Sequence, residues 1–408
     1  MNILNKIIKL LYLPIAITIL IIILVIQKFI LVRFMYLDFD RIGNFYYIDW
    51  YLTEKKLGRY SSKNFDIFYE RKVNEPNKFW SDKWRKELFI FNNYNLISLV
   101  VKLIKFLPNK EAFLVPRNYA YPTYKEYLNS KQITKNDIYY TRLSYILSDY
   151  KSNIDFNKNE ISKGNQLLLK LGLPSGQKYI CFHARDSKYL NVRFPKKNWT
   201  YHDYRDSNIN NYILAIEELT KKNLFGIRMG QIVKDDYQTS NKKIIDYSKS
   251  KIKSDFLDVY ISAKCKFFIC SDCGISSFPE AFKIPTVYTN WTALRRISTW
   301  VLDGIFIFKK IYSNKKNRLL FFSEIIDIDM DSKNERDKLG LEIIENTQED
   351  IKDACIEMNM RIDGEWIETD EDKKNQFLFW SLFGKDHLKS KKLLIGAKFL
   401  RDNANLIK

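Results

Sequence analysis

The chain has 408 residues, a formal net charge of +19 and 46% hydrophobic residues. This length is too great for one small domain and suits two lobes with large cores. The positive charge does not by itself indicate a nucleic-acid partner, because lysine is abundant along the whole sequence and no nucleic-acid-binding module is recognisable. Attraction to anionic lipid or to phosphorylated molecules explains the charge more simply.

An apolar run near the N-terminus predicts a membrane segment. Leu10 to Ile26 is almost unbroken hydrocarbon, close to the roughly 20 residues that cross a bilayer. The nearest charges lie outside it, at Lys6, Lys9, Lys28 and Arg33. No small-residue cleavage site follows, so we expect residues 1–34 to form an uncleaved transmembrane anchor. The alternative is a buried or monotopic hairpin kinked at Pro14.

Flanking charges and cysteines predict the compartment. Positive residues are slightly more frequent after the apolar run than before it, which places the body of the protein on the cytoplasmic side of the inner membrane. The five cysteines cannot all pair, and Cys181 and Cys270 lie in predicted buried strands, as expected in a reducing compartment. Cys270 and Cys273 form a lone C-x-x-C with no second ligand pair, so we expect neither a metal site nor a cofactor.

Residues 35–172 predict a first α/β lobe. The aromatic-rich pattern favours strands at 36–42, 46–52 and 65–68 and a helix at 95–106. A second helix is expected from Asn157 to Leu171, closed by Gly172. The Pro174-Ser175-Gly176 turn that follows reads as an interdomain link.

Residues 173–330 predict a second lobe with an open parallel sheet. Strands and helices alternate with short loops, which implies right-handed crossovers. The strands are expected at 179–183, 224–227, 266–270 and 285–289, and the helices at 208–222, 254–263 and 277–282. Residues 331–408 read as a peripheral helical extension in which Thr347 caps a helix to about Met360. The basic run 309–318 reads as a solvated face.

The first predicted strand ends in His183, Arg185 and Asp186, where a parallel strand delivers side chains to a ligand crevice. A guanidinium there can hold two phosphate oxygens. Alternatively, Arg185 and Asp186 only tie down the loop, and His183 is a packed histidine rather than a base.

Two further segments are expected at the same edge. The loop before the first helix of this lobe contains Tyr204, Arg205 and Asp206, and it reads either as part of the crevice or as a surface loop. The second strand ends in Arg228 and Gly230, which would bring a cation and closely approaching backbone to a ligand, unless this is a plain turn.

The segment from Ser271 to Glu280 predicts an anion site. Gly274 permits a turn, Ser276 or Ser277 caps the next helix, and the free N–H groups can bind a diphosphate. Glu280 then either accepts from a ribose or completes a capping box with Ser277. A similar start is expected where Ser254 precedes Asp255 and Asp258.

Together these segments resemble a family of bacterial surface-carbohydrate glycosyltransferases. The resemblance covers roughly residues 178–360 and rests on Phe182-His183-Ala184-Arg185-Asp186, Tyr204-Arg205-Asp206, Ile227-Arg228-Met229-Gly230, Ser254-Asp255-Phe256-Leu257-Asp258 and Ser271-Asp272-Cys273-Gly274. It implies a two-lobed GT-B-like α/β fold, with a Rossmann-like parallel sheet in each lobe, helices on both faces, and the acceptor bound by the first lobe. In fucosyltransferase-like members a His-x-Arg segment holds the donor diphosphate, and His183 and Arg185 match it.

The resemblance implies metal-independent transfer of a sugar from a nucleotide-sugar to a surface polysaccharide or its lipid-linked precursor at a membrane. The expected diphosphate ligands are Arg185, Arg228, Gly274, Ser276 and Ser277. The expected nucleoside ligands are Gly230, Asp255, Asp258 and Glu280. The candidate catalytic groups are His183, Asp186 and Asp206, with Tyr204, Arg205 and Asp272 elsewhere in the crevice.

Two rival functions remain at this point. One is another nucleotide-dependent transferase, such as a phosphotransferase or sulfotransferase, although the sequence lacks a phosphate-binding loop. The other is a non-catalytic, membrane-tethered scaffold of the same fold.

Overall fold

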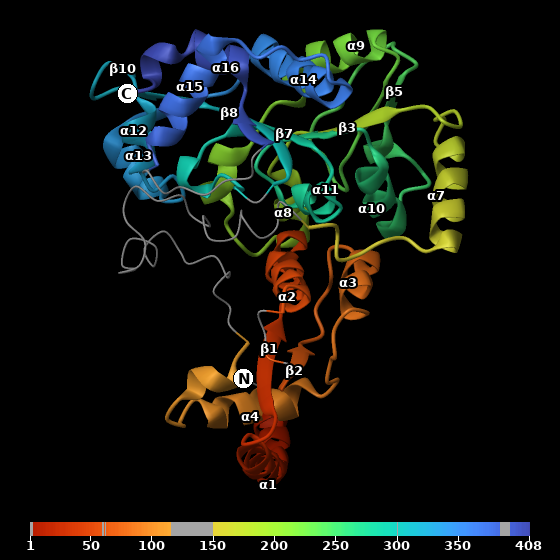
Figure 1. Ribbon diagram of the computed structural model, residues 1–408, viewed down its shortest axis with the longest axis vertical. Helices are drawn as coiled ribbons and strands as arrows, with labels where there is room; N and C mark the ends of the chain where they lie inside the picture. Colours follow the sequence, from red (N-terminus) through yellow and green to blue (C-terminus); the bar gives the residue numbers. More distant parts are fainter. Residues whose placement is uncertain (1–2, 59–60, 62, 116–149, 300, 384–391) are drawn as a thin grey trace. The chain divides into compact units, whose positions relative to one another are not determined.

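A computed structural model describes residues 3–58, 61, 63–115, 150–299, 301–383 and 392–408 (Figure 1). The chain divides into two compact units, Met1–Tyr121 and Pro122–Lys408, whereas the sequence suggested a boundary after residue 172. Helix α7 (Lys158–Lys170) therefore belongs to unit 2. In unit 2, α7 packs closely on Tyr260. A Cβ at Gly164 would lie only 2.3 Å from the tyrosine ring, so this contact requires glycine.

Unit 1 contains two parallel strands, β1 (Leu31–Leu37) and β2 (Asn64–Glu70), paired from Leu31 with Asn64 to Leu37 with Glu70. Its helices are α1 (Ile3–Ile26), α2 (Tyr46–Lys56), α3 (Lys78–Arg85) and α4 (Tyr94–Ile104). One side of α1 packs against α4 in a shared hydrophobic core.

The strand expected at 46–52 is wrong, because these residues begin helix α2. Its aromatic residues favour strands locally, but Tyr47, Ile48, Trp50 and Tyr51 are all buried, and tertiary burial overrides that preference. A complete Rossmann-like sheet is also not found, since the described part of unit 1 has only β1 and β2 in its sheet. The strand at 65–68 and the helix at 95–106 are confirmed.

The transmembrane segment expected over residues 10–26 is not confirmed. Within the described ranges, no helix is both long enough and apolar enough to cross a membrane.

Unit 2 is built on a seven-stranded sheet in the order β12-β8-β7-β6-β3-β4-β5, with every pairing parallel. Its strands are β3 (Tyr179–His183), β4 (Phe225–Arg228), β5 (Ile244–Asp246), β6 (Phe268–Cys270), β7 (Thr286–Trp291), β8 (Asp303–Phe308) and β12 (Lys392–Ile395). The expected α/β fold with an open parallel sheet is thus confirmed for this unit.

Helices cover both faces of this sheet. Figure 1 shows α9 (Ile213–Lys221) and α14 (Gln348–Asp363) on one face and α10 (Asp255–Lys264) and α11 (Ser277–Ala281) on the other. The other helices in the described part of unit 2, besides α7, are α8 (Lys188–Arg193), α12 (Phe322–Ile326), α13 (Lys333–Leu339), α15 (Asp370–Ser381) and α16 (Ala397–Asp402). The side chains of Ser254 and Thr347 cap their helices as predicted, and the side chain of Asn157 caps α7.

The strand order reverses beside β3. The chain passes from β3 to β4 and β5 on one side, then returns to β6, β7 and β8 on the other side. In parallel sheets the connections on the two sides of such a reversal diverge, and the carboxyl ends of the strands there, β3 and β6, are where a ligand crevice is expected.

Three strands of this sheet escaped the sequence analysis. Strands β5 and β12 have only three and four residues, and β8 is a short apolar run that periodicity cannot distinguish from a helix. Because β12 pairs with β8, residues 331–408 are not merely a peripheral helical extension. A separate antiparallel sheet contains β9 (Lys310–Ser313), β10 (Arg318–Leu319) and β11 (Leu341–Ile344).

Candidate functional site at the carboxyl edge of the sheet

Arg185 and Ser271 meet at the point where the strand order reverses. Arg185 follows β3, Ser271 follows β6, and the Arg185 backbone N–H donates to the Ser271 hydroxyl over 2.9 Å. Both residues are buried. The two loops that border the crevice are therefore fixed to each other.

The guanidinium of Arg185 is held at one end only. Its Nη1 donates to the His202 carbonyl over 3.2 Å and pairs with the Asp206 carboxylate. Among the described residues, its Nε and Nη2 have no hydrogen-bond partner. Burial lowers the pKa of Arg185, with the charge of nearby Arg205 as a second cause, so an anion would be favourable here.

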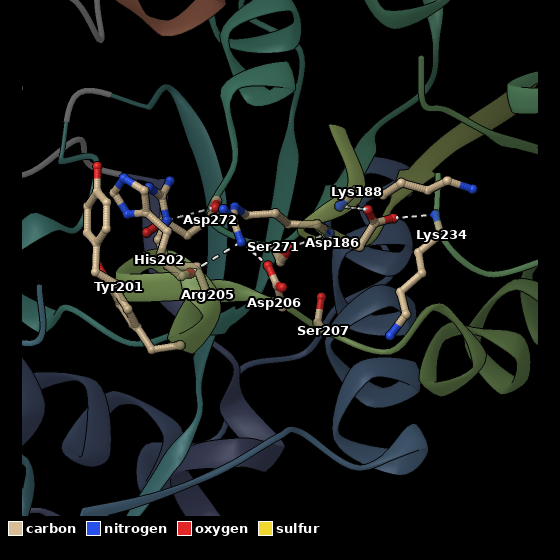
Figure 2. A network of polar contacts seen from close by, with 12 residues as sticks. Asp186, Lys188, Tyr201, His202, Arg205, Asp206, Ser207, Lys234, Ser271 and Asp272 are labelled. Atoms are coloured by element: carbon tan, nitrogen blue, oxygen red, sulfur yellow. Dashed lines mark hydrogen bonds and ion pairs between the residues drawn. The ribbon is translucent and has the colours of Figure 1, made fainter. Parts of the chain in front are cut away.

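The loop expected at the crevice is bonded to residues at the carboxyl edge of the sheet. Residues Thr200–Arg205 form a short 3₁₀ segment, and the Nη2 of Arg205 donates to Asp272 Oδ1 over 2.7 Å. Figure 2 shows Arg205, Asp206, Ser271 and Asp272 gathered in one polar network. This network joins the loop to the ends of β3 and β6.

Lys309 is a site residue that the sequence analysis missed. It directly follows β8, is buried, and donates from Nζ to the Tyr204 carbonyl over 3.2 Å and to the Asp206 carbonyl. Burial lowers its pKa to about 8, partly offset by Glu345. The missed strand β8 was the only signal that could have placed it at this edge.

His183 lies at the end of β3 and makes a hydrogen bond from Nδ1 to the Met229 carbonyl over 3.0 Å. Because a carbonyl only accepts, Nδ1 carries the proton and Nε2 of the neutral ring is an acceptor. Burial lowers the pKa of His183, and the positive charges of Arg228 and Arg185 act in the same direction. The ring is therefore neutral at physiological pH, as a base must be.

Gly230 is required beside this histidine. Its φ is +149°, and a Cβ there would lie 2.5 Å from Val233 and 3.6 Å from His183 Nδ1. The close backbone approach expected at this glycine is thus toward the protein's own histidine and valine.

Asp186 binds the backbone of two lysines near the carboxyl edge of the sheet. Its carboxylate accepts from the backbone N–H groups of Lys188 and Lys234, over 2.8 and 2.9 Å. Figure 2 shows Asp186 between these two residues. Both lysines are exposed, and neither ammonium forms an ion pair with a described residue.

Arg228 differs from Arg185, because both ends of its guanidinium are occupied. Nη1 binds Asp246 Oδ2 over 3.2 Å, Nη2 donates to the Asp235 carbonyl over 2.6 Å, and the residue is 2% exposed. In this structure Arg228 fixes the β4 and β5 ends to the next loop rather than facing a ligand.

The turn after β6 is shorter and less open than expected. Gly274 is exposed, but helix α11 has only five residues and no side-chain cap. Ser276 donates back to the Cys273 carbonyl over 3.0 Å, Ser277 is buried, and Glu280 accepts from Tyr288 over 2.6 Å. Ser276 is at the N-cap position but its side chain makes no cap bond, and Glu280 is bonded to β7 through Tyr288.

Asp255 and Asp258 lie in the first turn of α10, as predicted. The contact of Asp258 is with the segment after β5 and not with the network around Arg185. Asp258 accepts a hydrogen bond from Tyr247 over 2.7 Å. Burial raises its pKa to about 6, despite that bond. Asp258 thus connects α10 to the loop after β5.

Tyr204 connects the crevice loop to α13 and to the segment between α12 and α13. Its hydroxyl donates to Asp331, and Arg336 stacks over its ring at 4.6 Å. Asp331 also pairs with Arg296. Tyr204 is therefore a buried anchor for the loop that carries Arg205 and Asp206.

A cavity of about 490 Å³ lies at the opposite, amino end of β3, lined by Lys178, Tyr179, Tyr260, Lys264 and Lys266 among others. One of its lysines, Lys266, is already bound to Asn359 and Asp363. We favour the carboxyl edge as the site, because polar groups converge there and parallel sheets bind ligands at that edge. In the described residues no cluster of three or more His, Cys, Asp or Glu could hold a metal ion.

No protein-family model and no curated protein matches the chain. Among solved structures it is similar to a glycosyl transferase family 9 protein from Veillonella parvula DSM 2008, at 9% identity over 69% of this chain and 86% of that chain, with a TM-score of 0.39. It is also similar to the E. coli ADP-heptose lps heptosyltransferase II, at 14% identity over 67% of this chain and 90% of that chain, with a TM-score of 0.34. Likenesses this weak carry no conclusion about activity.

Proposed function

We propose that unit 2 binds the diphosphate of a nucleotide-sugar at the carboxyl edge of its sheet and that the chain transfers the sugar to an acceptor hydroxyl. The observation that carries this proposal is the state of Arg185. Its Nη1 is anchored by Asp206 and His202, while Nε and Nη2 have no partner among the described residues. Two adjacent N–H donors in one plane suit two phosphate oxygens.

Charge stabilisation is the main chemical need in such a reaction, because the departing nucleoside diphosphate gains negative charge. Arg185 sits at the crevice, Lys188 and Lys234 are exposed nearby, and Lys309 braces the loop that holds Asp206. In this proposal these side chains supply the positive charge, so transfer should persist in the presence of EDTA.

His183 is the favoured group for removing the acceptor proton. Its neutral ring presents Nε2 as an acceptor. Asp186 already accepts two backbone N–H bonds, and Asp206 is paired with Arg185. The acceptor itself, a surface glycan or its lipid-linked precursor, is proposed from the sequence resemblance alone, as is the placement at the cytoplasmic side of the inner membrane. The five free cysteines are compatible with that placement.

The test is calorimetric titration of the full chain with UDP, GDP, ADP and CDP, followed by assay of nucleoside diphosphate release from the matching nucleotide-sugars. Hydrogen bonds to a charged group contribute about 1.5–3 kcal/mol each, so Arg185→Ala should weaken binding at least tenfold. Arg185→Lys keeps the charge beside Asp206 and should be intermediate. The matched control is Arg361→Ala, which removes an arginine paired with Glu357 on α14.

Unchanged nucleotide affinity in the Arg185→Ala variant would overturn the proposal. Preferential binding of ATP with transfer of phosphate would favour the rival phosphotransferase. Donor binding without any hydrolysis or transfer would favour the non-catalytic scaffold.

A further inference from the structure

Helix α1 of unit 1 has an apolar side that is exposed in the described structure. Ala16 and Ile23 on the opposite side are buried against the core shared with α4. We name as the α1 face the exposed residues Leu11, Ile15, Ile17, Ile21, Ile22, Leu24, Val25, Phe29 and Ile30, together with Phe106 just after α4. Val25, Phe29 and Phe106 are 63%, 74% and 86% exposed. An apolar patch of this extent marks an interaction surface.

The two segments that carry the α1 face contain basic residues and no acidic ones. Residues 1–37 contain no Asp or Glu, and neither do residues 88–110, which include α4. Exposed lysines lie in the same two segments, at Lys28, Lys102 and Lys105. A partner must therefore combine hydrocarbon with negative charge.

We propose that the α1 face binds an anionic lipid bilayer, with α1 lying in the plane of the membrane interface. The exposed apolar side chains of α1 enter the boundary between headgroups and acyl chains, as those of an interfacial helix do, while the opposite side of α1 stays packed against α4. Lysines at the margin stay near the lipid phosphates and are attracted to them. Binding of this kind needs no helix that crosses the bilayer.

The charge pattern favours lipid over a second copy of the chain. A two-fold interface brings the same patch of each copy together. Lys28, Lys102 and Lys105 would then approach their own equivalents, and these segments offer no carboxylate to pair with them. A bilayer containing phosphatidylglycerol supplies both the hydrocarbon and the negative charge.

The test is flotation of the full chain with vesicles of phosphatidylcholine alone or with phosphatidylglycerol added. We expect binding to the anionic vesicles that weakens when salt is raised, because salt screens the lysine–phosphate attraction. Ile21→Asp with Val25→Asp should reduce the partition coefficient by about tenfold or more, since hydrocarbon burial drives such binding. Lys102→Glu with Lys105→Glu should reduce it on anionic vesicles only.

The matched control is Ile367→Asp with Phe377→Asp, which places the same charges on two exposed apolar residues of unit 2. These variants should float like the wild type, and circular dichroism should show that every variant is folded. Equal flotation of the Ile21 and Val25 variant would overturn the proposal. So would a wild-type dimer in sedimentation velocity that this variant dissociates, without vesicle binding. The test measures lipid binding and does not rest on the proposed reaction.

Discussion

The backbone N–H of Arg185 donates to the hydroxyl of Ser271 over 2.9 Å, across the reversal in strand order of the large sheet. This bond fixes the backbone of Arg185, after β3, to the side chain of Ser271, after β6. It therefore sets the point from which the Arg185 side chain extends. The candidate site thus depends on a contact between backbone and side chain as much as on the charged groups themselves.

Ser271→Ala should destabilise unit 2 and weaken nucleotide binding. The substitution leaves the buried N–H of Arg185 without a partner, which costs roughly 1–3 kcal/mol. Urea unfolding and nucleotide titration would measure the two effects. Ser98→Ala in α4, where the hydroxyl only donates to the Asn95 carbonyl at the helix surface, should change unfolding by no more than about 0.5 kcal/mol. Equal effects of the two substitutions would contradict the role of Ser271.

Arg228→Ala should lower stability without lowering nucleotide affinity in the protein that remains folded. Removing it leaves Asp246 without its cation in a largely buried place, and breaking such a pair costs about 3 kcal/mol. Unfolding in urea reports the loss, and titration at low temperature reports the affinity. A large drop in affinity at unchanged stability would return Arg228 to the role of a diphosphate ligand.

The stability contributed by Lys309 should depend on pH between about 8 and 10.5. Burial lowers its pKa to about 8 in the folded state, below the roughly 10.4 of an unfolded lysine. In this window the unfolded chain binds the proton and the folded chain does not, so stability rises with pH and is lost as pH falls through 8.

The measurement is the difference in unfolding free energy between the wild type and Lys309→Met at pH 8, 9 and 10. The difference should move in favour of the wild type by up to about 1.4 kcal/mol per pH unit. Lys221→Met provides a control, because Lys221 is an exposed lysine on α9 and should give no such slope.

Gly230→Ala should be far more damaging than Gly176→Ala. Both glycines have positive φ, but a Cβ at Gly230 would lie 2.5 Å from Val233, whereas nothing lies within 4 Å of one at Gly176. Strain alone costs about 1 kcal/mol, so Gly176→Ala should lose roughly that much. Gly230→Ala adds a clash beside His183 and should also reduce transfer. Similar unfolding midpoints for both variants would contradict this prediction, because they would show that the loop with Val233 moves to accommodate the Cβ at little cost.

Secondary structure could be predicted from the sequence where residue chemistry and hydrophobic periodicity indicate the same element. The cap at Ser254 and the strand ending in His183 both combine a local signal with the right length, and both are confirmed. Helix α2 was predicted wrongly, because tyrosines and tryptophan that favour strands locally are buried in a helix by distant residues.

The partners of the charged side chains in the candidate site could not be predicted from residue spacing in the sequence. Arg185 and Arg228 both follow a parallel strand, and the sequence treats them alike. They differ because Asp246 and the Asp235 carbonyl occupy both ends of Arg228, while the partners of Arg185 occupy one. Lys309 was missed for a similar reason, since its burial depends on the loop around Tyr204 and on a strand that periodicity did not reveal.

Strand β12 has a consequence for the synthesis of the protein. It pairs with β8, whose residues precede it by almost 90 positions (Leu393 with Gly304). Until Ile395 has emerged from the ribosome, β8 is an open edge that can pair with any extended chain nearby. Messages truncated shortly before this point should therefore yield aggregating products, and nascent chains should need protection by chaperones until β12 has been synthesised.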